Sequence, residues 1–286
     1  MRRKVLSCFV ALAMVVSLFA TLPVAAGAES GETGSPQLTD LSEEFCSVPE
    51  CPTTLAEGGF GQPVEINGVL YYEISTPEQL AHINEHLDLN YIQTADIDLS
   101  EYNSGEPDEG LWTPIALTDP DLFVFSAGFS GTYNGNDKTI SNLRIEFINT
   151  EETDGDPYGP DGQIAAGLFG ILEYGALIEN VNLTVTGIKI YYENYYITAG
   201  GICGYNKGAS IRNCLVTYEG DMEISGALDG SLGGISGFNT FDFYIEDPSE
   251  IESITSAISI NNCEARFEDG SIIVNSGFVT SGGISG

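Results

Sequence analysis

The sequence has few basic residues. Nine Lys and Arg stand against 42 Asp and Glu among 286 residues, and the formal net charge is −33. Such an acidic chain repels nucleic acids and other polyanions, and it favours solubility in a salty or calcium-containing exterior. The sequence therefore argues against a nucleic-acid partner and against an enzyme acting on acidic polysaccharides. Beyond the N-terminal segment the only basic residues are Lys138, Arg144, Lys189, Lys207, Arg212 and Arg266.

The sequence also contains only one long apolar run. MRRK precedes an apolar run that ends in VAAGA, with Ala26 and Ala28 as the small residues of an A-x-A cleavage site. This pattern predicts a secretory signal peptide over 1–28 and a secreted or extracellular product. Cys8 lies before the apolar run, where a lipobox cysteine would follow it, so lipidation is not expected. No second run is long enough to span a bilayer.

A glycine-rich motif appears four times. It reads AGLFG at 166–170, GGICGYN at 200–206, GGISGFN at 233–239 and GGISG at 282–286. The glycines at the second position of each motif, Gly167, Gly201, Gly234 and Gly283, are 34, 33 and 49 residues apart, and the last step contains an acidic insert at 241–253. A period of this size indicates a repeat architecture.

A strand pattern follows the same period. ISNLRIEF, IENVNLTV, IRNCLVTY and INNCEARF align on Asn142, Asn180, Asn213 and Asn262, and apolar residues alternate with mostly polar ones after each asparagine. The predicted inward columns are Leu143, Val181, Cys214 and Cys263; Ile145, Leu183, Val216 and Ala265; and Phe147, Val185, Tyr218 and Phe267. Cys214 and Cys263 are expected to be buried free thiols.

Three short strands and three corners fit about 33 residues. The sequence therefore predicts an all-β fold, a parallel, right-handed β-helix solenoid with a short N-terminal capping helix. The handedness follows only from the general preference of parallel crossovers. A propeller is the main alternative, but its blades need four antiparallel strands and a longer period.

The G-G-[IL]-x-G core with its following I-x-N-C/V strand resembles the GLUG repeat of bacterial secreted and surface proteins. YEISTPEQLAHI at 72–83, DIDLS at 96–100, WTPI at 112–115 and FSGTYNGNDKTISNLRI at 129–145 also fall in that family's order. The resemblance covers roughly 70–286. It implies an extracellular β-helical region, adhesin-like or upstream of immunoglobulin-A-cleaving zinc peptidase domains, and it supplies no catalytic residues.

The chain divides into four predicted regions. These are the signal peptide (1–28), a flexible linker (29–62), an N-terminal cap with the first coils (63–150) and the repeats (151–286). Cys46 and Cys51 lie in the linker, where a small disulfide loop and two free thiols are both open. The chain stops inside a repeat motif at Gly286, so the natural product is expected to continue.

A helix is predicted over 77–88. Thr76 is a suitable N-cap, Pro77 a first helical residue and Gln79 the partner in a capping box. This helix contains His82-Ile-Asn-Glu85-His86, which matches the inverted zinc-peptidase motif. A third ligand on a second helix is not apparent, so two solvent-facing histidines are the favoured interpretation over a metal site.

The remaining candidates for a catalytic or calcium-binding site are acidic residues. Asp96 and Asp98 alternate with apolar residues, so both carboxylates point to one side of a strand, either as an outward polar face or as a glycosidase or calcium pair. The loop at 150–163 carries Asp154, Asp156 and Asp161 but breaks the EF-hand pattern at Tyr158 and Ala165. A solvated loop is favoured there over a weak calcium site.

No nucleophile elbow, phosphate loop or zinc-finger spacing was identified in the sequence. The sequence predicts no catalytic, cofactor-binding or metal residue and no cofactor beyond that weak calcium possibility. The favoured function is a non-catalytic secreted or cell-surface module for adhesion, display or spacing, with a host or cell-surface protein or glycan as partner. The alternatives are the accessory region of a secreted peptidase and a carbohydrate-active β-helix enzyme.

Overall fold

Alternating apolar and polar residues form short strands throughout the computed structural model, which describes residues 45–102, 111–117, 127–149, 162–240, 259–275 and 279–284. The described residues belong to one compact unit that begins at Ser42. The predicted signal peptide, the loop with Asp154, Asp156 and Asp161, and the insert at 241–253 lie outside them. Among the described residues, no helix has both the length and the apolar character needed to cross a membrane.

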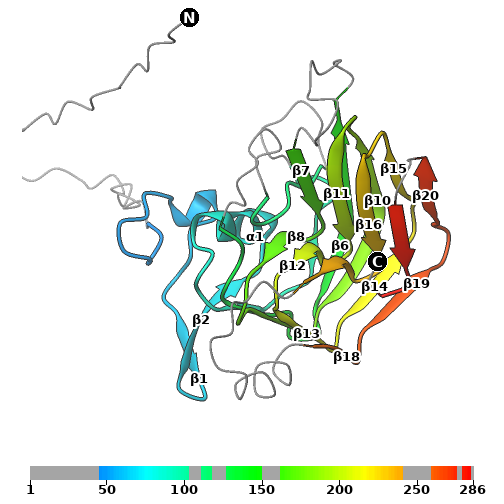
Figure 1. Cartoon of the computed structure of the whole chain (residues 1–286). Coiled ribbons are helices and arrows are strands. Elements are labelled where there is room, and N and C mark those ends of the chain that lie inside the picture. Colours follow the sequence, from blue (N-terminus) through cyan, green and yellow to red (C-terminus); the bar gives the residue numbers. More distant parts are fainter. Residues whose placement is uncertain are drawn as a thin grey trace, which may run out of the picture. The chain divides into compact units, whose positions relative to one another are not determined.

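The strands form four sheets (Figure 1). The first sheet contains, in order of pairing, β1 (Val64–Ile66), β2 (Val69–Ile74), β3 (Tyr91–Gln93), β5 (Thr132–Asn134), β9 (Leu177–Glu179), β13 (Ser210–Arg212) and β18 (Ile260–Asn261). The second contains β4 (Ile97–Asp98), β6 (Thr139–Ile148), β10 (Asn182–Tyr191), β14 (Leu215–Tyr218), β15 (Met222–Ser225), β19 (Glu264–Phe267) and β20 (Ile272–Asn275).

Two smaller sheets complete the structure. The third contains β7 (Gly162–Ala166), β11 (Tyr195–Gly200), β16 (Asp229–Gly233) and β21 (Val279–Gly282), and the fourth contains β8 (Phe169–Leu172), β12 (Cys203–Asn206) and β17 (Ser236–Asn239). Among the named strands only β1 and β2 pair antiparallel; the other pairs are parallel.

The repeated glycine motif makes the corner between the third and fourth sheets. β11 ends at Gly200 and β12 begins at Cys203, so Gly201 and Ile202 form the turn between them. A Cβ atom at Gly201 would lie 2.5 Å from Cγ1 of Val216 in the second sheet. At this position the repeat therefore requires glycine because the corner packs directly against another sheet.

The aligned asparagines take the left-handed conformation. Asn180, Asn213 and Asn262 have φ of 56°, 55° and 52°. The Nδ2 of Asn213 donates to Oδ1 of Asn180 at 3.1 Å, and Nδ2 of Asn262 donates to Oδ1 of Asn213 at 2.9 Å. Asparagine tolerates this backbone region better than other non-glycine residues, and its amide can both donate and accept, so these corners form a continuous hydrogen-bonded ladder.

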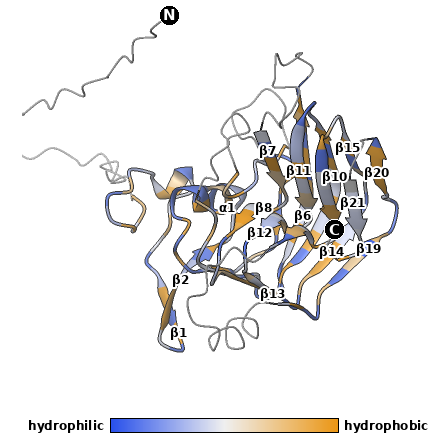
Figure 2. Ribbon diagram, in the orientation of Figure 1, coloured by the Kyte–Doolittle hydropathy of each residue, from blue (hydrophilic) through white to orange (hydrophobic). Residues whose placement is uncertain are grey.

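Most residues of the predicted inward columns lie in the core. Apolar and polar residues alternate along the strands of the second sheet (Figure 2). The fully or almost fully buried members are Leu143, Ile145, Val181, Leu183, Val185, Cys214, Val216 and Tyr218. Cys214 and Cys263 are free thiols, as predicted, although Cys263 in the last repeat is only partly buried.

The prediction of a right-handed parallel β-helix solenoid with a capping helix is wrong. The described strands form four separate sheets with mixed pairing and no regular solenoid. Along the first sheet, paired residues Tyr91, Tyr133, Ile178, Ile211 and Ile260 are separated by 42, 45, 33 and 49 residues. The 33-residue period that suggested identical coils therefore holds for only one of these steps.

The second sheet shows a further departure. β6 and β10 are long continuous strands, whereas the next repeat divides the same path into β14 and β15. The pairing of β6 with β10 contains two register shifts, so Leu143 pairs with Val185 and not with Val181. Asp137, with φ of 55°, occupies the corner that stacks on Asn180, because its N–H donates to the Asn180 carbonyl at 3.0 Å.

The predicted helix is shorter than 77–88. α1 spans Pro77–His82 and is followed by a 3₁₀ turn, η2 (Ile83–Glu85); a second 3₁₀ turn, η1 (Leu55–Glu57), precedes the first strand. The Thr76 hydroxyl accepts from the Gln79 N–H at 3.2 Å, which confirms the predicted N-cap. The Gln79 side chain bonds to Ser75 instead of closing the box on Thr76.

The asparagine ladder makes a testable contribution to stability. We expect Asn213→Ala to lower the free energy of unfolding by about 1–2 kcal/mol, because it removes amide hydrogen bonds and places alanine at positive φ. Asn213→Gly keeps the permitted backbone and loses only the amide, so its loss should be smaller. Urea unfolding of both variants measures the difference, and equal losses would contradict a role for the left-handed backbone.

Candidate functional site

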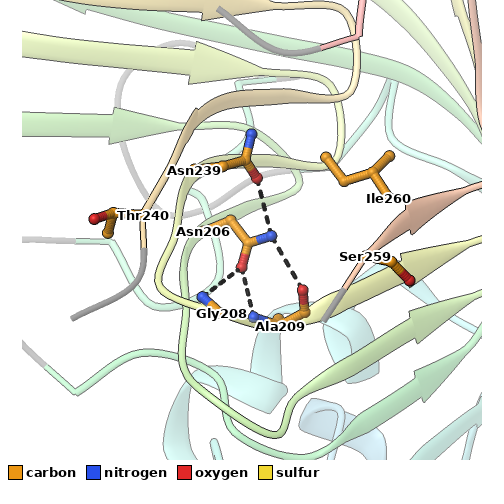
Figure 3. A pocket seen from close by; sticks show the side chains of 7 residues that line it. All are labelled: Asn206, Gly208, Ala209, Asn239, Thr240, Ser259 and Ile260. Atoms are coloured by element: carbon orange, nitrogen blue, oxygen red, sulfur yellow. Dashed lines mark hydrogen bonds between the residues drawn. The ribbon is translucent and has the colours of Figure 1, made fainter. Parts of the chain in front are cut away.

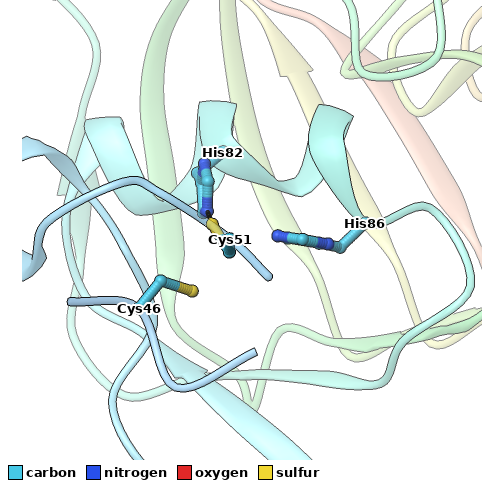
Figure 4. A group of neighbouring side chains, drawn as sticks. All are labelled: Cys46, Cys51, His82 and His86. Carbon is cyan, nitrogen blue, oxygen red and sulfur yellow. Dashed lines mark hydrogen bonds between the residues drawn. The ribbon is translucent and has the colours of Figure 1, made fainter. Parts of the chain in front are cut away.

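Two cysteines and two histidines from separate segments meet at one place. Cys46 and Cys51 come from the segment before β1, and His82 and His86 come from α1 and the turn after it (Figure 4). One ligand atom from each residue lies within 4.8 Å of the others. Sequence reasoning assigned these residues to a linker and to a solvent-facing helix, whereas the structure brings them together.

Backbone hydrogen bonds fix the segment that carries the cysteines. The Cys46 N–H donates to the Thr53 carbonyl at 2.7 Å, and the Ser47 N–H donates to the Phe60 carbonyl at 2.7 Å. The Cys51 N–H closes a turn onto Val48 at 3.2 Å. Residues 45–61, predicted as the end of a linker, therefore form a closed loop whose two cysteines face the same side.

The expectation that both histidines face solvent is wrong. His82 is only 6% exposed and Cys46 only 7%, while Cys51 and His86 are partly buried. Phe60, fully buried, packs its ring against His82 and His86 with centroid distances of 4.8 and 5.9 Å. The helix thus turns its histidines towards the loop because the aromatic ring of Phe60 fills the space beneath them.

Polar contacts orient three of the four side chains. Nε2 of His82 lies 3.3 Å from Sγ of Cys51, and Nδ1 of His82 lies 3.5 Å from Oε1 of Glu85. The Phe60 N–H donates to Sγ of Cys46 at 3.2 Å. Nε2 of His86 is buried and has no hydrogen-bond partner, alone among the buried side-chain nitrogen and oxygen atoms of the described residues.

Burial shifts the pKa of two members of the cluster, His82 and Cys46. Desolvation lowers the pKa of His82, so its imidazole is neutral and keeps a lone pair for a ligand. Desolvation raises the pKa of the Cys46 thiol, although hydrogen bonds from the Val48 and Phe60 backbones act in the opposite direction. A thiolate at Cys46 therefore needs a positive partner close by.

A sequence signal for this cluster was missed. Cys46-x₄-Cys51 and His82-x₃-His86 both fall within the spacings of Cys₂His₂ sites, C-x₂₋₄-C and H-x₃₋₅-H. The sequence does not connect the two pairs, because the cysteine pair lies in a segment of linker composition and the histidine pair lies on a helix that matches a peptidase motif. The third and fourth ligands lie on an earlier loop, not on a second helix.

The paired carboxylates have structural partners. Oδ1 of Asp96 accepts from the Thr139 N–H at 2.9 Å, and Oδ1 of Asp98 accepts from Nδ2 of Asn142 at 2.7 Å. This last hydrogen bond is the main cause of the lowered pKa of Asp98. Both carboxylates therefore connect β4 to β6, which agrees with the outward polar face favoured from sequence.

A surface groove of about 260 Å³ lies where the third and fourth sheets meet. Strand pairing within the third sheet places Tyr196 between Gln163 and Asp229, and pairing within the fourth sheet places Tyr205 beside Phe238. Tyr196 is 39% exposed and Phe238 37% exposed. The groove lining consists of Gln163, Tyr196, Thr198, Tyr205, Asp229, Gly230, Ser231 and Phe238.

The groove combines aromatic walls with polar groups. The rings of Tyr205 and Phe238 lie 5.3 Å apart, tilted by 35°, and Tyr205 joins Ala165 and Ile171 in a small apolar cluster separate from the main core. Thr198, Ser231 and Asp229 are the polar residues beside these rings, although Oγ1 of Thr198 donates to the Ile164 carbonyl at 3.4 Å and Oγ of Ser231 lies 2.9 Å from Oγ1 of Thr280. Apolar faces with a few convergent polar groups are typical of small-ligand sites.

In a second pocket, the polar side chain of Asn206 has a structural role (Figure 3). Nδ2 of Asn206 donates to Oδ1 of Asn239 at 3.0 Å and to the Ala209 carbonyl at 3.2 Å. Oδ1 of Asn206 accepts from the backbone N–H groups of Gly208 and Ala209. The Asn206 amide is thus engaged in holding a turn and in pairing β12 with β17.

Comparison with protein-family models, curated proteins and solved structures gives no match to this chain. The candidate sites therefore depend on their own geometry.

The packing of the four-residue cluster on Phe60 leads to a stability prediction. We expect Phe60→Ala to lower the free energy of unfolding by about 3–5 kcal/mol, because it removes a fully buried ring. Phe45, which is 54% exposed in the same segment, serves as the control, and Phe45→Ala should cost less than about 1 kcal/mol. Chemical denaturation measures both; similar losses would contradict this account of the packing.

Proposed function

We infer that the chain is a non-catalytic secreted or cell-surface module that binds a neutral glycan in the groove between its third and fourth sheets. The observation that carries this proposal is the exposure of two aromatic side chains, Tyr196 from the third sheet and Phe238 from the fourth, in one mainly apolar groove. Sugar rings present C–H faces that pack on aromatic rings and hydroxyls that exchange hydrogen bonds. A secreted or cell-surface module that binds glycans in this way, on a rigid sheet framework, would serve adhesion or display.

The negative charge of the chain favours neutral glycans over acidic ones as ligands. The formal net charge is −33, and Asp229 contributes a carboxylate to the groove itself. Sialylated or uronate-containing chains would meet repulsion from both. The carboxylate can instead accept hydrogen bonds from neutral sugar hydroxyls. A groove of about 260 Å³ is below the usual range for drug-sized ligands, about 300–1,000 Å³, which suits a terminal sugar better than a large cofactor.

The resemblance to GLUG-repeat proteins supports the extracellular setting of this proposal. The predicted signal peptide at 1–28 supports it independently. Three groove residues contributed by adjacent repeats, Gln163, Tyr196 and Asp229, lie on neighbouring strands of the third sheet. Their spacing is fixed by strand pairing, so the site requires no conformational change to form.

A glycan array probed with the mature chain tests the proposal. We expect binding to neutral glycans and little to sialylated ones. Tyr196→Ala and Phe238→Ala should each weaken binding about 10-fold or more, because exposed aromatic anchors dominate such contacts. Tyr174→Ala is the matched control, since Tyr174 is 44% exposed and outside the groove. Absence of glycan binding, or variants that bind as the unaltered chain does, would refute the proposal, and capture of a protein ligand instead would also count against it.

A further inference from the structure

We propose that Cys46, Cys51, His82 and His86 form a structural Zn²⁺ site that fastens the N-terminal loop to the helix α1. This site is independent of the proposed glycan groove. Its basis is the convergence of four ligand atoms within 4.8 Å, together with a buried Nε2 of His86 that has no partner. An unsatisfied buried nitrogen costs free energy and points to a missing ligand.

The distances suit a tetrahedral zinc ion. Zn–S bonds of about 2.3 Å and Zn–N bonds of about 2.0 Å place ligand atoms about 3.3–3.8 Å apart. Nε2 of His82 and Sγ of Cys51 are already 3.3 Å apart. The four atoms otherwise lie within 4.8 Å, so closure requires side-chain shifts of about 1 Å and no backbone rearrangement.

The donor set selects zinc by its chemistry. Two thiolates and two imidazoles in a tetrahedral arrangement are typical of Zn²⁺, whereas Ca²⁺ and Mg²⁺ prefer oxygen ligands. Two thiolates neutralise the double charge of the ion. The complete group therefore carries no net charge, which allows it to lie beside the buried ring of Phe60.

The surroundings supply the supporting contacts of a metal site. Glu85, 3.5 Å from Nδ1 of His82, holds that ring so that its Nε2 points to the cluster. The Phe60 N–H donates to Sγ of Cys46 at 3.2 Å, which stabilises a thiolate there. Glu85 is thus a positioning residue and not a ligand.

Four protein ligands leave no position for water or substrate. This arrangement indicates a structural role, because catalytic zinc sites keep one position open. The ion would join the loop at 45–61 to residues 82–86, two segments separated by β1 and β2. Among the described residues, this region joins the later strands by the pairing of β2 with β3 and by single hydrogen bonds such as that from the Ala116 N–H to Oδ1 of Asn84 at 2.7 Å.

A disulfide between Cys46 and Cys51 is the competing state for an exported protein. Both residues are free thiols in the structure. A disulfide would leave His82 and His86 without their sulfur partners and would not satisfy the buried Nε2 of His86. The zinc-bound state satisfies all four groups together.

Metal analysis of the mature chain tests the proposal. Purified without chelator, the protein should contain one zinc ion per chain by native mass spectrometry and elemental analysis. Replacement by Co²⁺ should give the thiolate charge-transfer and visible bands of a tetrahedral S₂N₂ site. A chain that contains no zinc and takes up none when Zn²⁺ is supplied, whether or not it carries a Cys46–Cys51 disulfide, would overturn the assignment.

Variants separate binding from folding. His86→Ala should lower zinc affinity about 100-fold or more, and Glu85→Gln about 10-fold. Cys263→Ser, at a partly buried cysteine elsewhere, and Glu78→Gln, at an exposed carboxylate on the same helix, should leave affinity unchanged. If the ligand variant fails to fold, chelation of the unaltered chain still decides the matter.

Chelation should lower Tm by about 5–10 °C, because a ligand bound only to the folded state stabilises it. Hydrogen exchange should rise at 45–61 and 77–86 and remain unchanged in β10 and β14. No shift in Tm and no local change in exchange would refute a structural role.

Discussion

Hydrogen bonds between asparagine side chains at the corners hold neighbouring repeats in register. At these corners the chain changes direction between one strand and the next. Asn213 lies between Asn180 and Asn262, takes positive φ and bonds to both through its amide. This combination permits the turn and pairs it with the turns on either side. The inward columns that fill the core, such as Val181 and Cys214, follow directly after these corners. Burial of those columns thus depends on the backbone of a small exposed residue.

The N-terminal region lacks this periodic support. β1 and β2 form an antiparallel hairpin at the edge of the first sheet, and the loop before them has no counterpart among the described repeats. It is joined to the main core by the buried side chains of Phe60, Leu80 and Ile83, and the cluster of cysteines and histidines lies around Phe60. A metal ion would supply the cross-link that strand pairing provides elsewhere, and small irregular segments commonly use this solution.

Sequence patterns predicted the features that recur and missed those that do not. Period-two alternation located the buried columns around Val185 and Val216, and the capping signal at Thr76 located the start of α1. The alignment of Asn142 with Asn180 failed because a bulged register between β6 and β10 is not visible in a pattern of apolar residues. The numbers of residues between paired positions of successive strands are also unequal, so the prediction of a regular solenoid was wrong. The meeting of Cys46 with His82 is a long-range contact between unlike segments, which local periodicity does not report.

The unequal numbers of residues between paired strands indicate where this chain can vary in length. Ile211 pairs with Ile260 in the same manner as with Ile178, although 49 residues separate the first pair and 33 the second. The strand framework accepts the additional residues between two of its strands without altering the pairing on either side. Sequence length at such a position is therefore nearly independent of the core. Foreign peptides grafted there would be presented on an unchanged framework, and natural selection could vary this region separately from the strands that carry it.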